Sequence, residues 1–194
     1  TPPDDKRHIE IWPWPVKIYT LGRFSISMNG VEFGADSRPE KLLKVLLAFG
    51  GRDVAEDIII DVLWPDTEGD QAQSNFNTTL HRLRKSFGDT KALSLRHHKL
   101  SINSQYCWVD NWRLSNIFSK AQCVKKSGSP ELAIELVTSI LDTYAGQFLS
   151  NETASWSIPL REKLRIQYVR HVMELSENIE AHNAELAIPK AFKN

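Results

Sequence analysis

The segment from Ser74 to Gly88, SNFNTTLHRLRKSFG, constrains the fold of this chain more than any other segment. Phe76, Leu80, Leu83 and Phe87 recur at intervals of three and four residues, which predicts one apolar stripe along a helix. Polar and basic side chains take the other positions, and the segment contains no Asp or Glu. Surface helices commonly carry both signs of charge, because residues four apart then form ion pairs. The segment therefore favours a helix whose outer face meets an anion, although an ordinary exposed basic helix remains an alternative when the segment is considered alone.

The charges of the chain are segregated, although its formal net charge is zero. Residues 53–70 include seven acids and no Lys or Arg, whereas residues 78–99 include six Lys or Arg and one acid. Acids are favoured at the start of a helix, which accounts for three of the seven. The remaining acids lie toward the connection that precedes the basic helix, namely Asp61, Asp66, Glu68 and Asp70. A basic segment of this kind fits a polyanionic partner such as DNA.

The composition excludes several other classes of protein. With 41% apolar and 25% charged residues, the chain is typical of globular proteins. The longest apolar runs fall well short of the ~20 residues that span a bilayer, so no membrane partner is predicted. The two cysteines, Cys107 and Cys123, imply no disulfide framework, and we therefore expect a cytoplasmic protein.

No sequence pattern indicates catalysis or a cofactor. The phosphate-binding loop, the nucleophile elbow and the zinc-protease helix are all missing from the sequence, so we predict neither an enzyme nor a bound cofactor. His97, His98 and Cys107 raise the question of a metal site. Adjacent histidines on a hairpin point to opposite faces, and the spacing fits no common zinc pattern, so no metal is predicted.

The first half of the chain predicts strands followed by three helices. Residues 1–15 are polar and rich in proline, and we expect a linker there. Alternating apolar residues and the Asn29-Gly30 turn signal predict a small antiparallel sheet over residues 16–34. The first predicted helix begins with Ser37 and Glu40 at the spacing of a capping box and stops at Gly50.

Two more helices and a hairpin are expected next. VAEDIIIDVLWP predicts a second helix, with acids in its first turn and a proline stop. Asp70 is placed to cap a third helix, from Gln71 to Phe87. ALSLRHHKLSINSQYCWVD then predicts two short strands with the basic tip RHHK between them.

The second half of the chain is helical in pattern. Helices are predicted over residues 112–126, 130–143 and 159–187, and SGSP separates the first two. Paired amphipathic helices with short breaks predict an all-α, tetratricopeptide-like stack.

This order of elements resembles a known family of bacterial regulators. YTLGRFSISMNG, DVLWPD and TTLHRLRKSFG resemble the OmpR/PhoB-type winged helix-turn-helix. CWVDNWRLSNIF, YAGQFL and the tryptophan before the last helix resemble the bacterial transcriptional activation domain of SARP-type regulators. The resemblance implies an α+β winged helix over residues 16–110, with an N-terminal antiparallel sheet, three helices and a C-terminal hairpin wing. It also implies a helical, incomplete activation domain over residues 111–194.

The resemblance also assigns roles to residues. It places Thr78, Arg82 and Asn75 at base edges, and the wing tip along the adjacent minor groove or backbone. The full set of expected DNA contacts is Asn75, Thr78, Thr79, His81, Arg82, Arg84, Lys85, Arg96, His97, His98 and Lys99. The family's loop that faces RNA polymerase corresponds to Asp66, Glu68 and Asp70.

The sequence thus predicts a DNA-binding transcriptional activator that has no catalytic activity. Its expected partners are double-stranded DNA and RNA polymerase, with a head-to-tail dimer formed on DNA. The WPVKIYTLGRF segment also resembles regulators in which this module follows a large sensor or ATPase region. The alternative is a protein-interaction adaptor whose helical region binds the partner and whose winged helix is structural.

Overall fold

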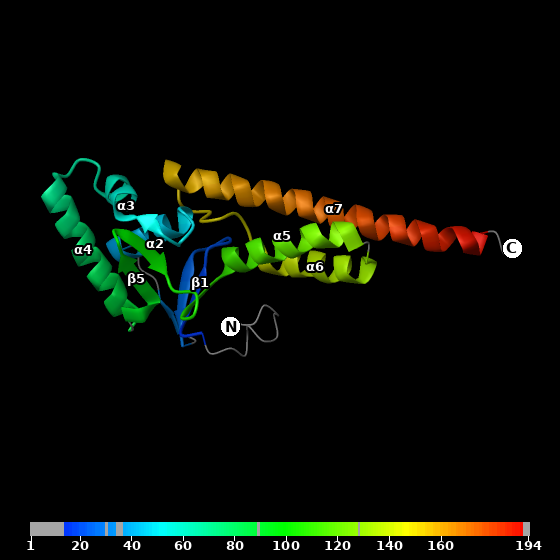
Figure 1. Cartoon of the computed structure of the whole chain (residues 1–194), viewed down its shortest axis with the longest axis horizontal. Coiled ribbons are helices and arrows are strands. Elements are labelled where there is room, and N and C mark those ends of the chain that lie inside the picture. Colours follow the sequence, from blue (N-terminus) through cyan, green and yellow to red (C-terminus); the bar gives the residue numbers. More distant parts are fainter. Residues whose placement is uncertain (1–13, 30, 34–36, 89, 128, 192–194) are drawn as a thin grey trace.

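The computed structural model describes residues 14–29, 31–33, 37–88, 90–127 and 129–191. A mixed body of short strands and helices occupies one end of the molecule, and a helical arm extends from it (Figure 1). Within these described residues, no helix is both long enough and apolar enough to cross a membrane.

The first sheet joins the start of the chain to a strand from its middle. It contains β1 (Val16–Tyr19), β2 (Ser25–Met28), β3 (Val31–Phe33) and β7 (Cys107–Val109), in the order β3-β2-β1-β7. The antiparallel sheet predicted near the N-terminus is confirmed by the β1–β2 and β2–β3 pairs. The sequence prediction did not include β7, which pairs with β1 in parallel.

The two faces of β1 have different environments, as the alternation of its side chains predicts. Val16 and Ile18 are fully buried in the core, whereas Lys17 and Tyr19 point to the opposite face and are half-buried. The outer face of this sheet therefore presents polar and aromatic side chains.

Three helices pack against one another in this body. The predicted helices are confirmed as α2 (Arg38–Ala48), α3 (Glu56–Leu63) and α4 (Gly69–Ser86). The central helix, α2, packs against both α3 and α4. Its buried residues are Leu42, Leu43, Val45, Leu46 and Leu47.

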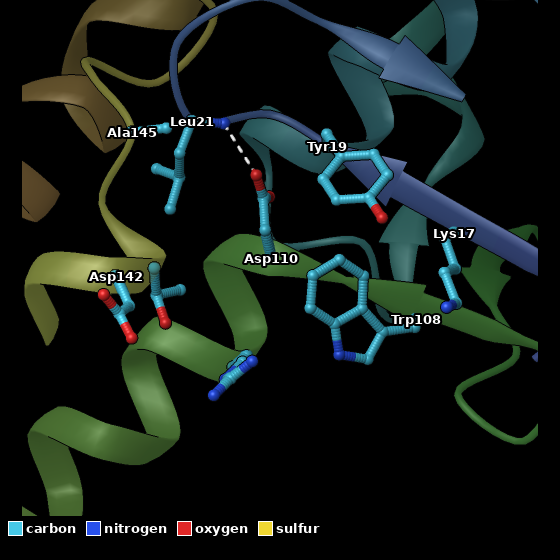
Figure 2. Close-up of a pocket in the computed structure, with 9 residues that line it drawn as sticks. Lys17, Tyr19, Leu21, Trp108, Asp110, Asp142 and Ala145 are labelled. Atoms are coloured by element: carbon cyan, nitrogen blue, oxygen red, sulfur yellow. Dashed lines mark hydrogen bonds between the residues drawn. The ribbon is translucent and has the colours of Figure 1, made fainter. Parts of the chain in front are cut away.

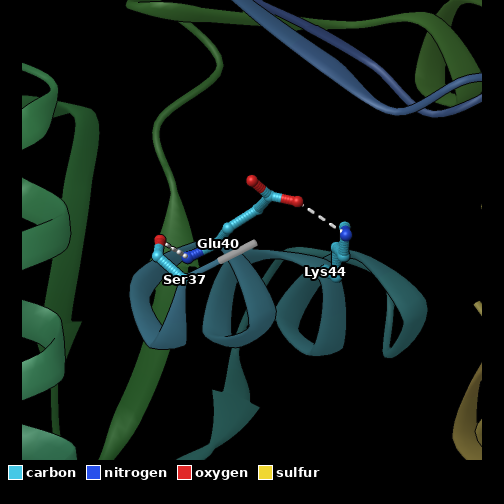
Figure 3. A network of polar contacts seen from close by, with 3 residues as sticks. All are labelled: Ser37, Glu40 and Lys44. Carbon is cyan, nitrogen blue, oxygen red and sulfur yellow. Dashed lines mark hydrogen bonds and ion pairs between the residues drawn. The ribbon is translucent and has the colours of Figure 1, made fainter. Parts of the chain in front are cut away.

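The N-terminus of α2 shows half of the predicted capping box. The Ser37 hydroxyl accepts a hydrogen bond from the Glu40 backbone N–H at 3.4 Å (Figure 3). The Glu40 carboxylate does not return to the Ser37 N–H but lies 2.6 Å from the Lys44 ammonium. Lys44 itself lies over the Phe24 ring, with its nitrogen 4.8 Å from the ring centre. Glu40 thus contributes an ion pair one helical turn along α2.

The second sheet contains the predicted hairpin and one strand that was not predicted. Its order is β4-β6-β5, with β4 (Val54–Ala55), β5 (Leu93–Arg96) and β6 (Lys99–Ile102). A short 3-10 helix, η1 (Thr90–Ala92), leads from α4 into β5.

Three helices form the arm, as the sequence predicts. They are α5 (Asp110–Ser127), α6 (Pro130–Thr143) and the 34-residue α7 (Ile158–Ala191), with η2 (Ser155–Ser157) before α7. The α6 helix packs against α5 and α7, and α7 continues beyond the ends of both (Figure 1).

One buried carboxylate joins the first sheet to the arm. Asp110 begins α5 and is 4% exposed. Its Oδ2 accepts hydrogen bonds from the backbone N–H groups of Thr20 and Leu21 at 2.7 and 2.8 Å. Its Oδ1 accepts from the Thr20 hydroxyl at 2.6 Å and from the Asn111 N–H at 2.7 Å. Three of these four donors are backbone or side-chain groups at the end of β1, so the carboxylate fixes α5 to that strand.

A close approach of two chain segments adds to this junction. The Gly22 N–H donates to the Gln147 carbonyl at 2.9 Å, and the Leu149 N–H donates to the Thr20 carbonyl at 2.8 Å. A Cβ atom on Gly146 would lie 3.0 Å from the Gly22 Cα. Glycine is required at this crossing because the backbones leave no space for a side chain.

Candidate nucleic-acid interface

The exposed face of α4 collects polar and basic side chains. One side of the helix is buried against the core through Ala72, Phe76, Leu80 and Leu83, so the predicted stripe is confirmed. Figure 1 shows α4 at the end of the molecule that is farthest from the arm. The exposed side chains of α4 are Asp70 in its first turn, followed by Gln71, Ser74, Asn77, Thr78, His81, Arg82, Lys85 and Ser86.

Two residues expected at DNA lie elsewhere on α4. Thr79, predicted near a phosphate, is buried and 7% exposed, because it lies on the side of α4 that packs against the body. Arg84 is half-buried, and its Nη2 donates to the Leu93 carbonyl at 3.4 Å. Arg84 thus links α4 to β5, and Thr79 belongs to the core. Asn75 is half-buried, and its side-chain oxygen accepts a hydrogen bond from Gln71 at 3.1 Å.

The β5–β6 hairpin carries the second basic group. Arg96, His97 and Lys99 are exposed at its turn. The φ angles of His97 and His98 are 49° and 60°, as in the tight turns that match the twist of a hairpin. These side chains and the basic face of α4 belong to neighbouring parts of the chain, connected through η1.

His98 is held by an acid rather than left free. Its Nδ1 lies 2.6 Å from Oε1 of Glu56, which is 5% exposed, and the Glu56 N–H donates to the His98 carbonyl at 2.9 Å. The hydrogen bond to the Glu56 carboxylate raises the pKa of His98, and the Coulombic attraction acts in the same direction. The hairpin tip is thus attached to the start of α3. Sequence reasoning treated Glu56 as a helix-start acid and did not find this pair.

The three acids expected to face RNA polymerase are exposed around the α3–α4 connection. Asp66 and Glu68 lie in the connection, and Asp70 lies in the first turn of α4. The prediction that Asp70 caps α4 was wrong, because the helix begins at Gly69 with Glu68 at the cap position and no side-chain capping bond. Asp70 remains near the positive end of the helix dipole, where a carboxylate is favoured.

The histidines and the cysteine considered for metal binding are not grouped together. Cys107 is buried, and burial raises the pKa of its thiol to about 12. Its Sγ donates a weak hydrogen bond to the Ala92 carbonyl at 3.8 Å. Among the residues that the structure describes, no three His, Cys, Asp or Glu side chains come together as metal ligands would.

Comparison with known proteins shows a likeness at the level of structure. No family model matches the sequence, and no curated protein matches it. EmbR from Mycobacterium tuberculosis, solved in complex with a low affinity phosphopeptide, is similar over 92% of this chain, with a TM-score of 0.73 and 19% identity. The two chains share a fold. This chain spans about half (49%) of the EmbR chain in that structure.

The likeness to EmbR supports the mixed α/β architecture with small sheets and six helices. It extends from the strands into the arm, since 92% of the chain is covered. At 19% identity the likeness shows the fold alone and assigns no role to individual residues of α4 or the hairpin.

Proposed function

We propose that this chain is a sequence-specific DNA-binding transcriptional regulator of the SARP type, with an OmpR/PhoB-like winged helix formed by β1 to β7. The observation that carries this proposal is the outer face of α4. Its exposed side chains are hydrogen-bonding or basic, and it has no acid after the first turn. The fold shared with EmbR, a regulator of that type, supports the same conclusion.

In this proposal α4 enters the major groove. A major groove is wide enough for a helix and presents base-edge donors and acceptors between two rows of phosphates. Thr78 and Arg82 lie one turn apart on the exposed face and suit base edges, with Asn75 beside them. His81 and Lys85 suit the phosphates. Thr79 is not included, because its side chain is buried.

The hairpin would contact the adjacent backbone as a wing. Arg96, His97 and Lys99 are exposed at its turn, and basic groups there add attraction to phosphate without reading sequence. Glu56 holds the turn in place through His98, so the wing approaches DNA with a fixed tip.

Fluorescence anisotropy with cognate and random duplexes, at two salt concentrations, tests this proposal. Arg82→Ala should reduce discrimination between the duplexes as well as affinity, because a bidentate contact to guanine is worth about 1–3 kcal/mol. Lys99→Ala should weaken binding to both duplexes alike and lower the salt slope by about one unit. The control is Arg165→Ala on α7, an exposed arginine on the arm. Absence of any salt-dependent binding by the unmodified chain would refute the proposal.

We further propose that Asp66, Glu68 and Asp70 contact a basic surface of RNA polymerase. All three are exposed, and acids next to a DNA-binding helix weaken attraction to phosphate. Changing them to Asn, Gln and Asn should leave DNA affinity unchanged or higher, whereas transcription activation in vitro should fall. Activation at the unmodified level with DNA fully occupied would contradict this contact.

Specific binding would require two copies. One winged helix reads few base pairs, which is too little to select one site among ~10⁶ or more competitors. We therefore propose a head-to-tail pair that forms on direct repeats one helical turn apart. Sedimentation of the chain without DNA should show monomers, and a tight dimer in that experiment would contradict the proposal.

A protein-interaction adaptor is the second candidate, and one observation favours it. Ile166, Val169 and Met173 on α7 are 57%, 45% and 57% exposed, and their spacing places them along one side of the helix. Exposed apolar groups of this kind suit a protein partner. An adaptor should show no binding to random DNA at either salt concentration, whereas a DNA reader should bind with an affinity that falls steeply with salt.

A further inference from the structure

A cavity of about 270 Å³ lies between the outer face of the first sheet and the beginning of the arm (Figure 2). Its basic lining residues, Lys17 and Arg113, are balanced by the acids Asp110 and Asp142. The cavity therefore favours neither sign of charge and selects no class of ligand. The exposed side of α4 is more selective, because its polar side chains follow an order along the helix.

Four polar side chains form a row along the exposed side of α4. They are Gln71, Asn75, Thr78 and Arg82, and their intervals of three and four residues place them within about 60° of one another around the helix. Gln71, Thr78 and Arg82 are exposed, and Asn75 is half-buried. The neighbouring acid, Asp70, projects about 100° away from Gln71, so the row itself carries no negative charge.

The amide of Gln71 is held by the residue one turn along the helix. Its Nε2 donates a hydrogen bond to Oδ1 of Asn75 at 3.1 Å. That bond uses one of the two amide hydrogens of Gln71, so the second hydrogen and the amide oxygen can serve a ligand. A mobile side chain loses rotamer freedom when it binds, and this bond removes part of that loss before DNA arrives.

An amide that offers one N–H and one oxygen matches the edge of adenine. In the major groove adenine presents its N7 acceptor and its N6 donor, and a glutamine amide can bond to both. Gln71, oriented by Asn75, would donate to N7 and accept from N6. Residues near the start of a recognition helix commonly contact base edges, and Gln71 lies in the first turn of α4. Arg82, at the other end of the row, matches guanine.

We propose that Gln71 contacts an adenine and that Asn75 is its positioning residue. This inference rests on the proposed function, because α4 must first enter the major groove. The row from Gln71 to Arg82 is about 16 Å long at ~1.5 Å per residue, and base pairs are stacked about 3.4 Å apart, so the row covers up to about five base pairs. Long side chains can lean toward each other, so an A·T pair should lie about three to five base pairs from the guanine that Arg82 contacts.

Selection of bound duplexes from a random library tests this inference with the full chain. The unmodified chain and its variants each enrich duplexes, and sequencing gives the base preferences. Arg82→Ala should lose one guanine, whereas Gln71→Ala should keep that guanine and lose an adenine about three to five base pairs from it. The matched control is Gln73→Ala, because Gln73 is half-buried on the opposite side of α4, and this variant should keep both preferences. A retained guanine preference also shows that Gln71→Ala is folded.

Fluorescence anisotropy with the selected duplex measures the size of the effect. Replacing the A·T pair by G·C should weaken binding of the unmodified chain by about tenfold or more, and binding of Gln71→Ala by less than about twofold. Asn75→Ala should also reduce this discrimination, because the Gln71 amide is no longer oriented. Asn75→Asp keeps an acceptor oxygen for Gln71, so it should keep the discrimination while its negative charge lowers the affinity for both duplexes alike.

Three results would overturn the inference. They are a Gln71→Ala consensus identical to that of the unmodified chain, loss of a base other than adenine in that variant, and full discrimination by Asn75→Ala. Failure of the proposed function gives a different result, because the unmodified chain would then enrich no motif at all, and the present inference would fail with it.

Discussion

Replacing Asp110 by asparagine would test the junction between the first sheet and the arm. The carboxylate accepts hydrogen bonds from the Thr20 N–H and hydroxyl, the Leu21 N–H and the Asn111 N–H. An asparagine side chain keeps one acceptor oxygen and presents an NH₂ group in place of the other. If the amide oxygen keeps the two N–H groups of Thr20 and Leu21, the Thr20 hydroxyl can rotate to accept from the NH₂. The Asn111 N–H then faces a donor.

The loss in the free energy of unfolding follows from the hydrogen bonds that the asparagine weakens or breaks. One buried donor without an acceptor costs about 1–3 kcal/mol, and hydrogen bonds to a neutral acceptor are about 1 kcal/mol weaker than those to a charged one. Burial raises the pKa of Asp110, which shows that the buried charge is itself unfavourable. Removing that charge therefore offsets part of the stability lost with the hydrogen bonds. The net effect of Asp110→Asn should be a loss of about 2–4 kcal/mol in the free energy of unfolding.

Urea unfolding followed by far-UV circular dichroism at neutral pH measures this loss. The matched control is Asp61→Asn, because Asp61 is exposed on α3. The control should change the free energy of unfolding by no more than about 0.5 kcal/mol. If Asp110→Asn also stays within that range, the four hydrogen bonds do not stabilise the fold and the reasoning fails.

Three further substitutions probe other contacts. Phe76→Ala should cost about 3–5 kcal/mol of unfolding free energy in urea, because Phe76 is fully buried, and a loss below about 1 kcal/mol would show that the core collapses onto the site. Glu56→Gln should lower the pKa of His98, measured by titrating its ring signals. In the unmodified chain, the stabilisation that the protonated His98–Glu56 pair gives to the fold is fully present below the ordinary His pKa of 6.5 and is lost as pH rises through the raised pKa of His98. An unchanged His98 titration in the Glu56→Gln variant would contradict the pairing. Arg161→Lys should speed hydrogen exchange over residues 148–157, because the guanidinium donates to three carbonyls there, and exchange equal to that of the unmodified chain would count against this role.

The sequence was informative where structure depends on neighbours a few residues apart. The stripe of Phe76, Leu80 and Leu83 is a property of helical spacing, and the structure buries all three. The prediction for Thr79 was wrong because this residue is buried beside the apolar stripe of α4. Its burial depends on how the rest of the protein packs against α4, and the residue type does not indicate that packing. Asp70 was misjudged for a smaller reason, since helix starts are uncertain by one or two residues.

Contacts between distant parts of the chain were not predictable from local pattern. The residues of β7 carry no feature that selects β1 as a parallel neighbour. Asp110 follows a strand and begins a helix, so as a sequence it is an ordinary helix-start acid, and its bonds to Thr20 cross 90 residues. Glu56 was concealed in the same way, because its partner His98 lies 42 residues away.

The parallel pairing of β1 with β7 also affects folding during synthesis and the choice of expression fragments. During synthesis, the edge of β1 stays unpaired until Cys107–Val109 leaves the ribosome, and an open strand edge can pair with other chains. A fragment that stops after the hairpin, at Ile102, would keep α4 and every basic residue of the candidate interface yet leave that edge open. Expression fragments of the N-terminal half of the chain should therefore extend beyond Asp110, and those ending earlier should aggregate.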